Sequence, residues 1–106
     1  MQEKIKNMIR FAIRARKYAL GETIISTCSK GNAIKLVLIA SDASDASKKK
    51  YCDKLTYYKI NYVIYSTKNE LGDLLNKNEI SAFAIKDANI AKQVYKLIKE
   101  GDWYGI

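Results

Sequence analysis

The chain contains three short apolar segments separated by stretches of helical periodicity, and this alternation constrains the fold most strongly. The segments cover residues 35–40 (KLVLIA), 61–65 (NYVIY) and 80–85 (ISAFAI). Their length and their branched and aromatic residues are typical of strands. The first is apolar at successive positions, as expected of a strand with helices on both faces of its sheet. Strands that alternate with helices predict an α/β/α sandwich.

The intervening segments predict helices. Residues 5–13 place apolar side chains at helical spacing, and basic side chains fall on the opposite face at Lys6, Arg10, Arg14 and Lys17. Residues 18–20 form a short apolar link or a brief strand. Further helices should run over residues 22–29 and 45–58, through 71–75, and from residue 88 onward.

Two of these helices have clear start signals. Thr67 and Glu70 have the spacing of a capping box, in which each side chain satisfies groups at the start of the helix. Asp87 should cap the last helix in a similar way. We therefore expect one domain over residues 1–106, with a core at about 4–99 and a short tail at 100–106.

Composition excludes several classes of protein. The 106 residues are 48% apolar and 28% charged, which is typical of a globular chain. The longest apolar run, residues 36–40, is far shorter than the roughly 18–20 residues of a membrane span. Charges at Glu3, Lys4, Lys6 and Arg10 interrupt the region where a signal peptide would be apolar. We expect a cytoplasmic protein without a membrane partner.

Catalysis and metal binding find little support. Histidine, the most frequent metal ligand and general base, is absent, and Cys28 and Cys52 do not form a CxxC pair. The two thiols are expected in the core or on a helix face, with a disulfide as a less supported alternative. No nucleophile, base and orienting group can be placed together. We expect neither an enzyme nor a bound cofactor or metal.

Asp42 and Lys86 follow two of the expected strands, as in phosphoacceptor receiver domains. That fold also needs an acidic pair after its first strand to hold magnesium, and this chain begins with a basic helix instead. We interpret Asp42 as a turn or cap residue and Lys86 as a solvent-facing strand end.

The positive charge is concentrated in the first half of the chain. Residues 1–59 hold thirteen Lys and Arg against five Asp and Glu, whereas residues 60–106 hold six of each kind. A basic region on a small domain attracts polyanions, because binding releases their condensed counterions. Arg14, Arg16 and Lys17 come just before Gly21, and Lys30 follows the second expected helix. Nucleic acid is therefore the first partner to consider.

Gly21, Glu22 and Thr23 stand where a short strand or turn enters a helix. A glycine at such a point lets a phosphate or a base edge approach the backbone closely, and the first N–H groups of the helix are free to bind it. The same residues also fit a simple turn with Thr23 near the cap. Tyrosines in the middle third of the chain could stack on bases, but packing in the core or an interface is the more common role.

In order along the chain, the segments resemble the ribosomal L7Ae/L30e family, in particular its small bacterial members. The resemblance rests on the basic helix leading into Leu20-Gly21-Glu22, then on residues 30–44, Lys49-Lys50, Tyr57-Tyr58, Leu71-Gly72 with Lys77 downstream, and residues 84–87. It covers about residues 9–98. It implies a three-layer α/β/α sandwich with a mixed central sheet.

The resemblance also implies RNA binding, in many members at kink-turns. In those members the glycine and the first turn of the second helix enter the RNA groove, and the loop before the last strand covers an extruded nucleotide. Carried over by position, these two surfaces are Gly21, Glu22, Thr23, Ile24 and Thr27, and Asn76, Lys77, Asn78, Glu79 and Ile80.

Three positions depart from the kink-turn pattern. Kink-turn binders carry a polar pair two and three residues after the glycine and a lysine six residues after it, whereas this chain has Thr23, Ile24 and Thr27 there. An isoleucine cannot hydrogen-bond to a guanine edge, and a threonine does not pair with a phosphate as a cation does. The resemblance thus predicts the fold and RNA binding more firmly than kink-turn recognition.

The sequence therefore predicts a non-catalytic RNA-binding protein, ribosomal or otherwise associated with translation. Structured RNA is the expected partner, with ribosome-associated proteins as possible further partners. The expected RNA-binding residues are Arg14, Arg16, Lys17, Gly21, Glu22, Thr23, Thr27, Lys30, Asn76, Lys77, Asn78 and Ile80. The alternative is a protein-interaction module on the same fold, which would use Ile24 and the tyrosines as an apolar patch.

Overall fold

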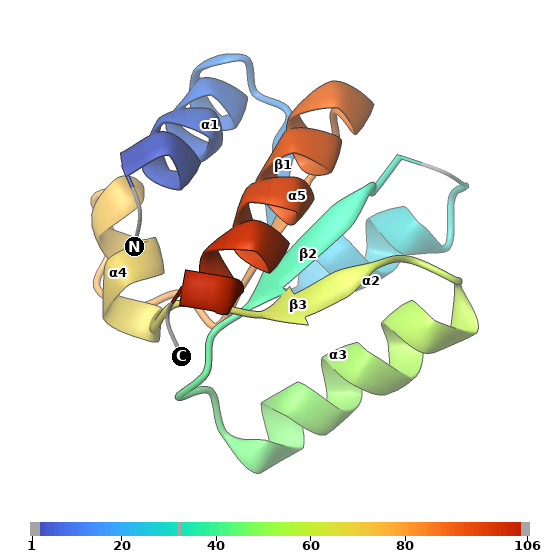
Figure 1. Cartoon of the computed structure of the whole chain (residues 1–106). Helices are drawn as coiled ribbons and strands as arrows, with labels where there is room; N and C mark the ends of the chain where they lie inside the picture. Colours follow the sequence, from blue (N-terminus) through green and yellow to red (C-terminus); the bar gives the residue numbers. More distant parts are fainter. Residues whose placement is uncertain (1–2, 32, 105–106) are drawn as a thin grey trace.

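A computed structural model describes residues 3–31 and 33–104, with side chains through residue 99 (Figure 1). Across these residues the chain forms five helices and four strands. The helices are α1 (Glu3–Arg14), α2 (Glu22–Cys28), α3 (Asp45–Tyr57), α4 (Lys68–Leu74) and α5 (Ala88–Tyr104). The strands are β1 (Tyr18–Leu20), β2 (Leu36–Ile39), β3 (Tyr62–Ile64) and β4 (Ala82–Ile85).

The four strands form one mixed sheet in the order β1-β4-β2-β3. Strand β4 is antiparallel to both of its neighbours, and Ile85 lies between Tyr18 of β1 and Leu36 of β2. Strands β2 and β3 are parallel, with Val37 paired to Tyr62. The last strand in sequence is thus inserted between the first two, which the linear order of the segments does not reveal.

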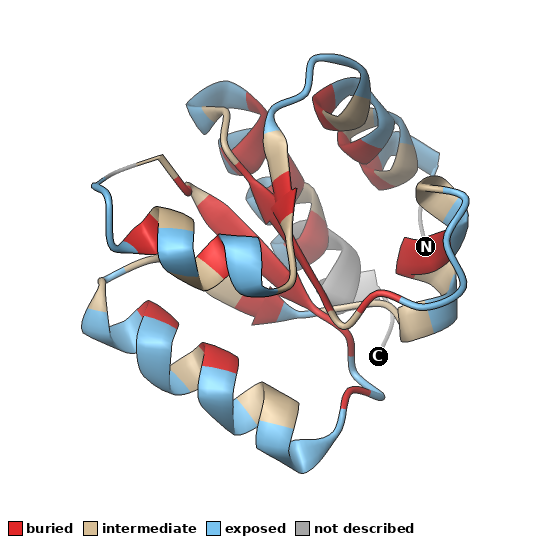
Figure 2. Ribbon diagram, turned by 180° about the vertical axis from the view of Figure 1, so that it is seen from behind, coloured by how far each residue is buried: buried red, intermediate tan, exposed pale blue. Residues whose placement is uncertain are grey.

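Helices cover both faces of the sheet and create two apolar clusters. One cluster packs α1, α4 and α5 against one face and includes Ile9, Phe83 and Val94. The other packs α2 and α3 against the opposite face and includes Ile24 and Leu55. Figure 2 shows the buried residues along the strands and on the sheet-facing sides of the helices. Every residue of β2 and β4 is buried, because each strand contributes side chains to both clusters.

The predicted α/β/α sandwich is confirmed, and so are the residues predicted to cap the starts of α4 and α5. Thr67 Oγ1 accepts from Glu70 N at 3.2 Å, and the Glu70 carboxylate in turn accepts from the hydroxyls of Ser66 and Thr67. The Ser66 hydrogen bond is the main cause that holds the pKa of Glu70 below its ordinary value. Asp87 Oδ1 accepts from Ile90 N at 2.9 Å and caps α5.

Two helix ends differ from the sequence prediction. Helix α1 stops at Arg14, so Lys17 lies beyond it and not on its outer face. Helix α5 continues to Tyr104 and takes in most of the segment expected as a tail, while residues 105–106 lie outside the described residues. A single glycine inside a helix costs only about 1 kcal/mol relative to alanine, which explains why Gly101 does not end α5.

Three helices end at a residue with positive φ that is not glycine. Arg16 (φ 57°), Lys59 (φ 59°) and Asn76 (φ 56°) follow α1, α3 and α4. In each case the next residue donates its N–H to a carbonyl five residues earlier, as Lys17 does to Ala12 at 2.8 Å. This is the hydrogen-bond pattern of a Schellman motif, in which glycine is the favoured residue.

Replacing Lys59 with glycine should therefore stabilise the protein. The left-handed conformation costs any residue other than glycine about 1–2 kcal/mol, and glycine removes this cost. Part of the stabilisation is offset because glycine has greater conformational freedom in the unfolded chain. We expect a net gain of about 0.5–1 kcal/mol, or a Tm higher by about 2–8 °C. Thermal unfolding followed by circular dichroism measures it.

Lys59→Ala is the matched control, because it removes the same charge and keeps the strained backbone. An equal rise in Tm for both variants would attribute the effect to charge and contradict the backbone explanation.

Candidate nucleic-acid interface

Gly21 forms an open turn between β1 and α2. Its backbone has φ 57° and ψ −135°, a conformation that only glycine adopts without strain. A Cβ built at this position would meet no other atom within 4 Å, so the turn faces open space. A ligand can therefore approach the backbone here directly. Any other residue would both strain the turn and block the approach.

A hollow of about 350 Å³ lies beside this turn and joins the two surfaces expected to bind RNA. Because β1 and β4 are antiparallel and Leu20 pairs with Phe83, the chain leaving β1 meets the chain entering β4. The hollow is lined by Leu20, Gly21, Tyr51, Lys77, Glu79, Ile80, Ser81 and Ala82. The contribution of Tyr51, which is 6% exposed, could not be read from the sequence because it comes from α3.

The loop on the far side of the hollow is fixed to α4. Lys77 N donates to Gly72 O at 2.9 Å, and Ile80 N donates to Lys68 O at 3.1 Å. A Cβ at Gly72 would come within 2.7 Å of Lys77 O and 2.9 Å of Asn78 O. Gly72 is thus required by the close approach of the loop backbone, and the position of the loop depends on it.

Arg16 belongs to a neighbouring hollow of about 620 Å³ that runs along β1. It is lined by Ile13, Arg16, Tyr18, Ala19, Leu20 and Thr23. Leu20 borders both hollows, and we call the Leu20–Gly21 turn between them the ridge. The structure therefore brings Arg16 and Thr23 to one side of this ridge and Lys77 and Ile80 to the other.

Glu79 lines the Gly21 hollow and Glu22 directly follows Gly21, and each carboxylate is paired with a lysine. Glu22 Oε1 contacts Lys50 Nζ, and Glu79 Oε2 lies 3.3 Å from Lys68 Nζ. The hydrogen bond to Glu22 is the main cause that raises the pKa of Lys50. These pairs limit the repulsion that the carboxylates would exert on a polyanion. They also leave Lys77 as the uncompensated cation that lines the hollow among the described residues.

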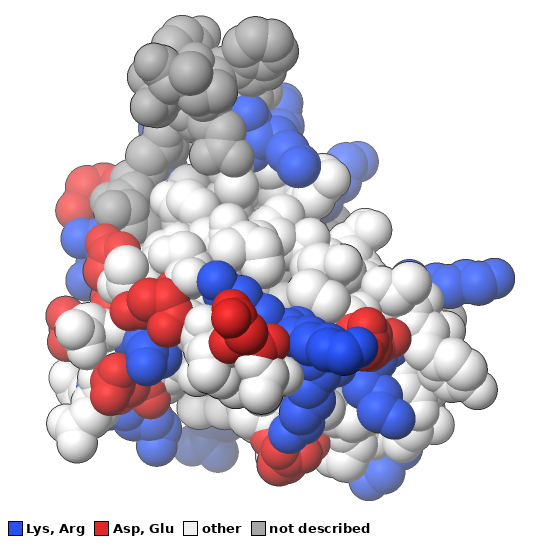
Figure 3. Space-filling model, turned by 90° about the horizontal axis from the view of Figure 1, so that it is seen from below, with Lys and Arg blue, Asp and Glu red and all other residues white. Residues whose placement is uncertain are grey.

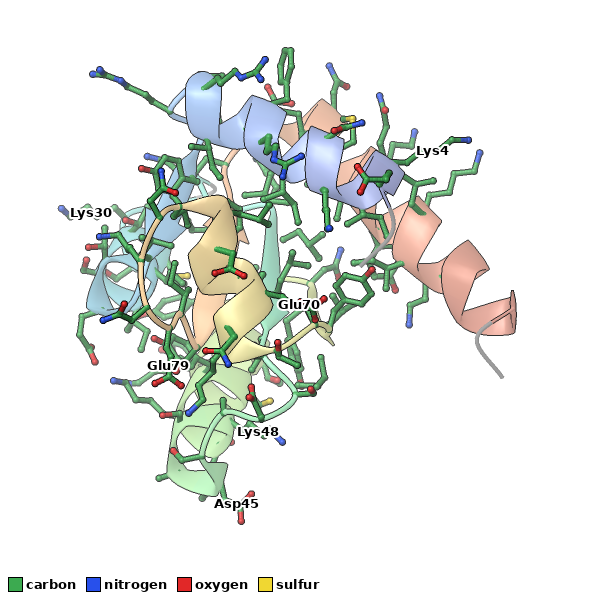
Figure 4. The ribbon with its side chains drawn as sticks, turned by 90° about the vertical axis from the view of Figure 1, so that its left-hand side faces the viewer. Lys4, Lys30, Asp45, Lys48, Glu70 and Glu79 are labelled. Carbon is green, nitrogen blue, oxygen red and sulfur yellow. The ribbon has the colours of Figure 1, made fainter. Side chains whose placement is uncertain are left out.

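The four expected basic residues outside the 76–80 loop lie at the opposite edge of the sheet, meaning the row of strand ends away from Gly21. Arg14, Arg16 and Lys17 come before β1, and Lys30 comes before β2, whereas Gly21 follows β1. Of these, Arg16 also lines the hollow along β1 that includes Leu20 and Thr23. Figure 4 shows Lys30 well apart from Glu79, which marks the loop beside the Gly21 hollow. The charge that the sequence placed around the glycine is thus divided between two edges of the sheet.

Helix α2 itself contributes less than the sequence suggested. It has seven residues, too few for a strong macrodipole, so side chains and the turn must supply the attraction for an anion. Ile24 is fully buried in the α2 and α3 cluster, which corrects its assignment to an exposed apolar patch. Thr27 is half-buried, while Asn76 and Asn78 are exposed in the α4–β4 loop.

The remaining candidate groups have structural roles. Asp42 Oδ1 accepts from Lys68 N at 2.8 Å and adds a cap to α4, as interpreted from the sequence. Cys28 is buried and Cys52 is half-buried, and both are free thiols. Burial raises the pKa of the Cys28 thiol. Within residues 3–31 and 33–99, no group of three or more Cys, Asp or Glu side chains is arranged to hold a metal ion.

No helix in the described part of the chain has the length and apolar character to cross a bilayer.

Tyr57 is the clear exception to the expectation that the tyrosines pack in the core, because its side chain is 77% exposed. Its ring makes an edge contact with Tyr58 at 4.9 Å, and Tyr58 in turn packs against the α2 and α3 cluster.

The sequence of the chain matches a family model over residues 3–100, that of the ribosomal protein L7Ae/L30e/S12e/Gadd45 family. The chain belongs to this family. Two relatives in it are the RNA-binding protein YlxQ of Enterococcus faecium and that of Bacillus subtilis strain 168. The first is 32% identical over 92% of this chain and 94% of its own length. The second is 32% identical over 86% of this chain and 91% of its own length.

A solved structure also matches the fold of this family member. It is a protein of unknown function from Bacillus halodurans, with a TM-score of 0.85 and 29% sequence identity. The match covers 92% of this chain and 99% of the other. The family resemblance and the α/β/α sandwich read from the sequence are thereby confirmed. RNA binding is supported by the names of the relatives.

Gly72→Ala should displace the loop that borders the Gly21 hollow. The added methyl group overlaps backbone carbonyls that cannot rotate away, so the loop has to move or the protein loses about 1–3 kcal/mol. We expect amide resonances of residues 76–81 to shift and their hydrogen exchange to accelerate, as measured by NMR. Asn69→Ala, at an exposed position of the same helix, should leave both unchanged. Unaltered exchange in Gly72→Ala would show that the loop does not depend on this contact.

Proposed function

We propose that this protein binds structured RNA without catalysing a reaction, and that the RNA docks on the Leu20–Gly21 ridge. The observation that carries the proposal is the hollow that joins the open glycine turn to the α4–β4 loop. Its floor offers backbone groups at Gly21, and its rim offers the ammonium group of Lys77. Family membership and the RNA-binding names of the relatives support the same partner.

In this proposal the residues have distinct roles. The backbone at Gly21 and Glu22 receives a phosphate or a base edge, and Thr23 offers a hydroxyl beside it. Arg16 and Lys77 neutralise phosphates on the two sides of the ridge. The loop that holds Asn76, Asn78 and Ile80 sets the orientation of the RNA. Thr27 lies one turn further along α2 and contributes at the margin.

The wider setting is also part of the proposal. We place the protein in the cytoplasm, in ribosomal or translation-associated complexes, with the whole chain acting as one RNA-binding unit. Contacts with ribosome-associated proteins would accompany RNA binding. Kink-turn recognition is a narrower form of the proposal, since Thr23, Ile24 and Thr27 replace the side chains on which other kink-turn binders rely.

Lys77→Ala and Arg16→Ala should each weaken binding to an RNA hairpin that carries a bulge and sheared G·A pairs. Each lost phosphate contact should reduce the slope of log K against log salt by about 0.7–0.9. Fluorescence anisotropy at several salt concentrations measures both the affinity and the slope. The same titration with Watson–Crick pairs in place of the G·A pairs measures kink-turn specificity.

Lys96→Ala is the matched control, because Lys96 lies on α5 in a groove with α1 and away from the ridge. If Lys77→Ala and Arg16→Ala gave the same slope as the unmodified protein, the ridge would not be the RNA site.

A further inference from the structure

The edge of the sheet away from the Gly21 hollow is strongly basic, whereas the edge at Gly21 carries charges of both signs. Tyr18, Leu36 and Ile85 are paired across β1, β2 and β4, so the chain entering β1 and β2 meets the chain leaving β4. The start of β3 joins them, because Val37 N donates to Asn61 O at 3.1 Å. Four connecting segments thus converge on one edge.

These four segments carry six basic residues, namely Arg16, Lys17, Lys30, Lys35, Lys59 and Lys86, and Arg14 ends helix α1 just before the first segment. Their one acidic residue is Asp87, whose carboxylate is engaged in capping α5. The segments at the Gly21 edge, with the first residues of the helices that follow them, carry Glu22, Asp42, Asp45 and Glu79 together with Lys68 and Lys77. In Figure 3 the end of the molecule where α3 terminates, on the right of the view, shows Lys and Arg without Asp or Glu.

A further hollow, of about 230 Å³, is set into this basic edge. It is lined by Lys35, Leu36, Asn61, Ala88, Ala91, Lys92 and Tyr95. The small side chains of Ala88 and Ala91 on α5 and the buried Leu36 give it an apolar floor. Its polar side-chain groups are two ammonium groups, one amide and the hydroxyl of Tyr95, and no carboxylate lines it among the described side chains.

An aromatic ring completes the hollow. Tyr95 is 38% exposed, and Lys99 Nζ lies 5.4 Å from the centre of its ring, which brings a third ammonium group to the rim. An exposed ring offers a base a surface for stacking, and neighbouring lysines offer a phosphate its countercharge. An amide such as that of Asn61 can both donate to and accept from a base edge.

We propose that this hollow holds one nucleotide of a single-stranded RNA segment, with its phosphate between Lys35 and Lys92 and its base against Tyr95. The row of cations along the edge then binds the phosphates on either side. A single-stranded RNA segment is the occupant that fits, because a free nucleotide would leave most of these cations without a phosphate to bind. The inference rests on the proposed RNA-binding function and adds a second contact on the opposite edge from the Gly21 ridge.

A labelled decauridylate tests the site, because it has no duplex to dock on the ridge. Tyr95→Ala should weaken its binding at least about fivefold, since stacking on an aromatic side chain contributes about 1–3 kcal/mol per base. Tyr95→Phe keeps the ring and should bind as the unmodified protein does. Lys35→Ala and Lys92→Ala should each reduce the salt slope by about 0.7. Lys96→Ala, one turn from Lys92 and outside the hollow, should not.

Two competitors identify the occupant. Uridine monophosphate at the concentration of decauridylate sites should displace little of the strand, and an oligoglutamate of matched charge should displace little as well. Equal binding by Tyr95→Ala, or displacement by either competitor as effective as that by unlabelled decauridylate, would overturn the proposal. Since Lys77→Ala affects the hairpin and Tyr95→Ala affects the strand, a failure of one site is distinguishable from a failure of the other.

Discussion

The insertion of β4 between β1 and β2 is the arrangement on which the rest of the structure depends. Its backbone pairs with both neighbours, and its four side chains are divided between the two apolar clusters. The same pairing brings the α4–β4 loop to the Gly21 turn at one edge and the start of α5 to the entrances of β1 and β2 at the other. Both candidate RNA surfaces are therefore consequences of one antiparallel strand.

Two glycines support this arrangement by different physical means. Gly21 provides a backbone conformation that a side chain would strain, and it leaves the turn open to a ligand. Gly72 provides room, because the loop backbone lies where its Cβ would be. One glycine thus exposes the ridge, and the other positions the opposite wall of the same hollow.

Charge is separated across the sheet more clearly than along the chain. The sequence showed an excess of Lys and Arg in residues 1–59 and placed it around Gly21. In the fold, Glu22 and Glu79 lie beside that glycine with their paired lysines, while six basic residues lie in the connecting segments at the opposite edge. A polyanion that contacts both edges would bind backbone groups at the Gly21 edge and basic side chains at the opposite edge.

The sequence by itself determined the elements, their caps and the family, because apolar periodicity, Thr67, Asp87 and the ordered motifs are local signals. It also identified Gly21 and the 76–80 loop as candidate site residues. Only the tertiary structure decided that Ile24 is buried and that Tyr51 lines the Gly21 hollow. It also decided that Lys35, Asn61 and Tyr95 line one hollow at the basic edge. Those facts depend on the strand order and on which helix covers which face of the sheet. Neither can be predicted from local sequence patterns, because both are set by contacts between residues distant in sequence.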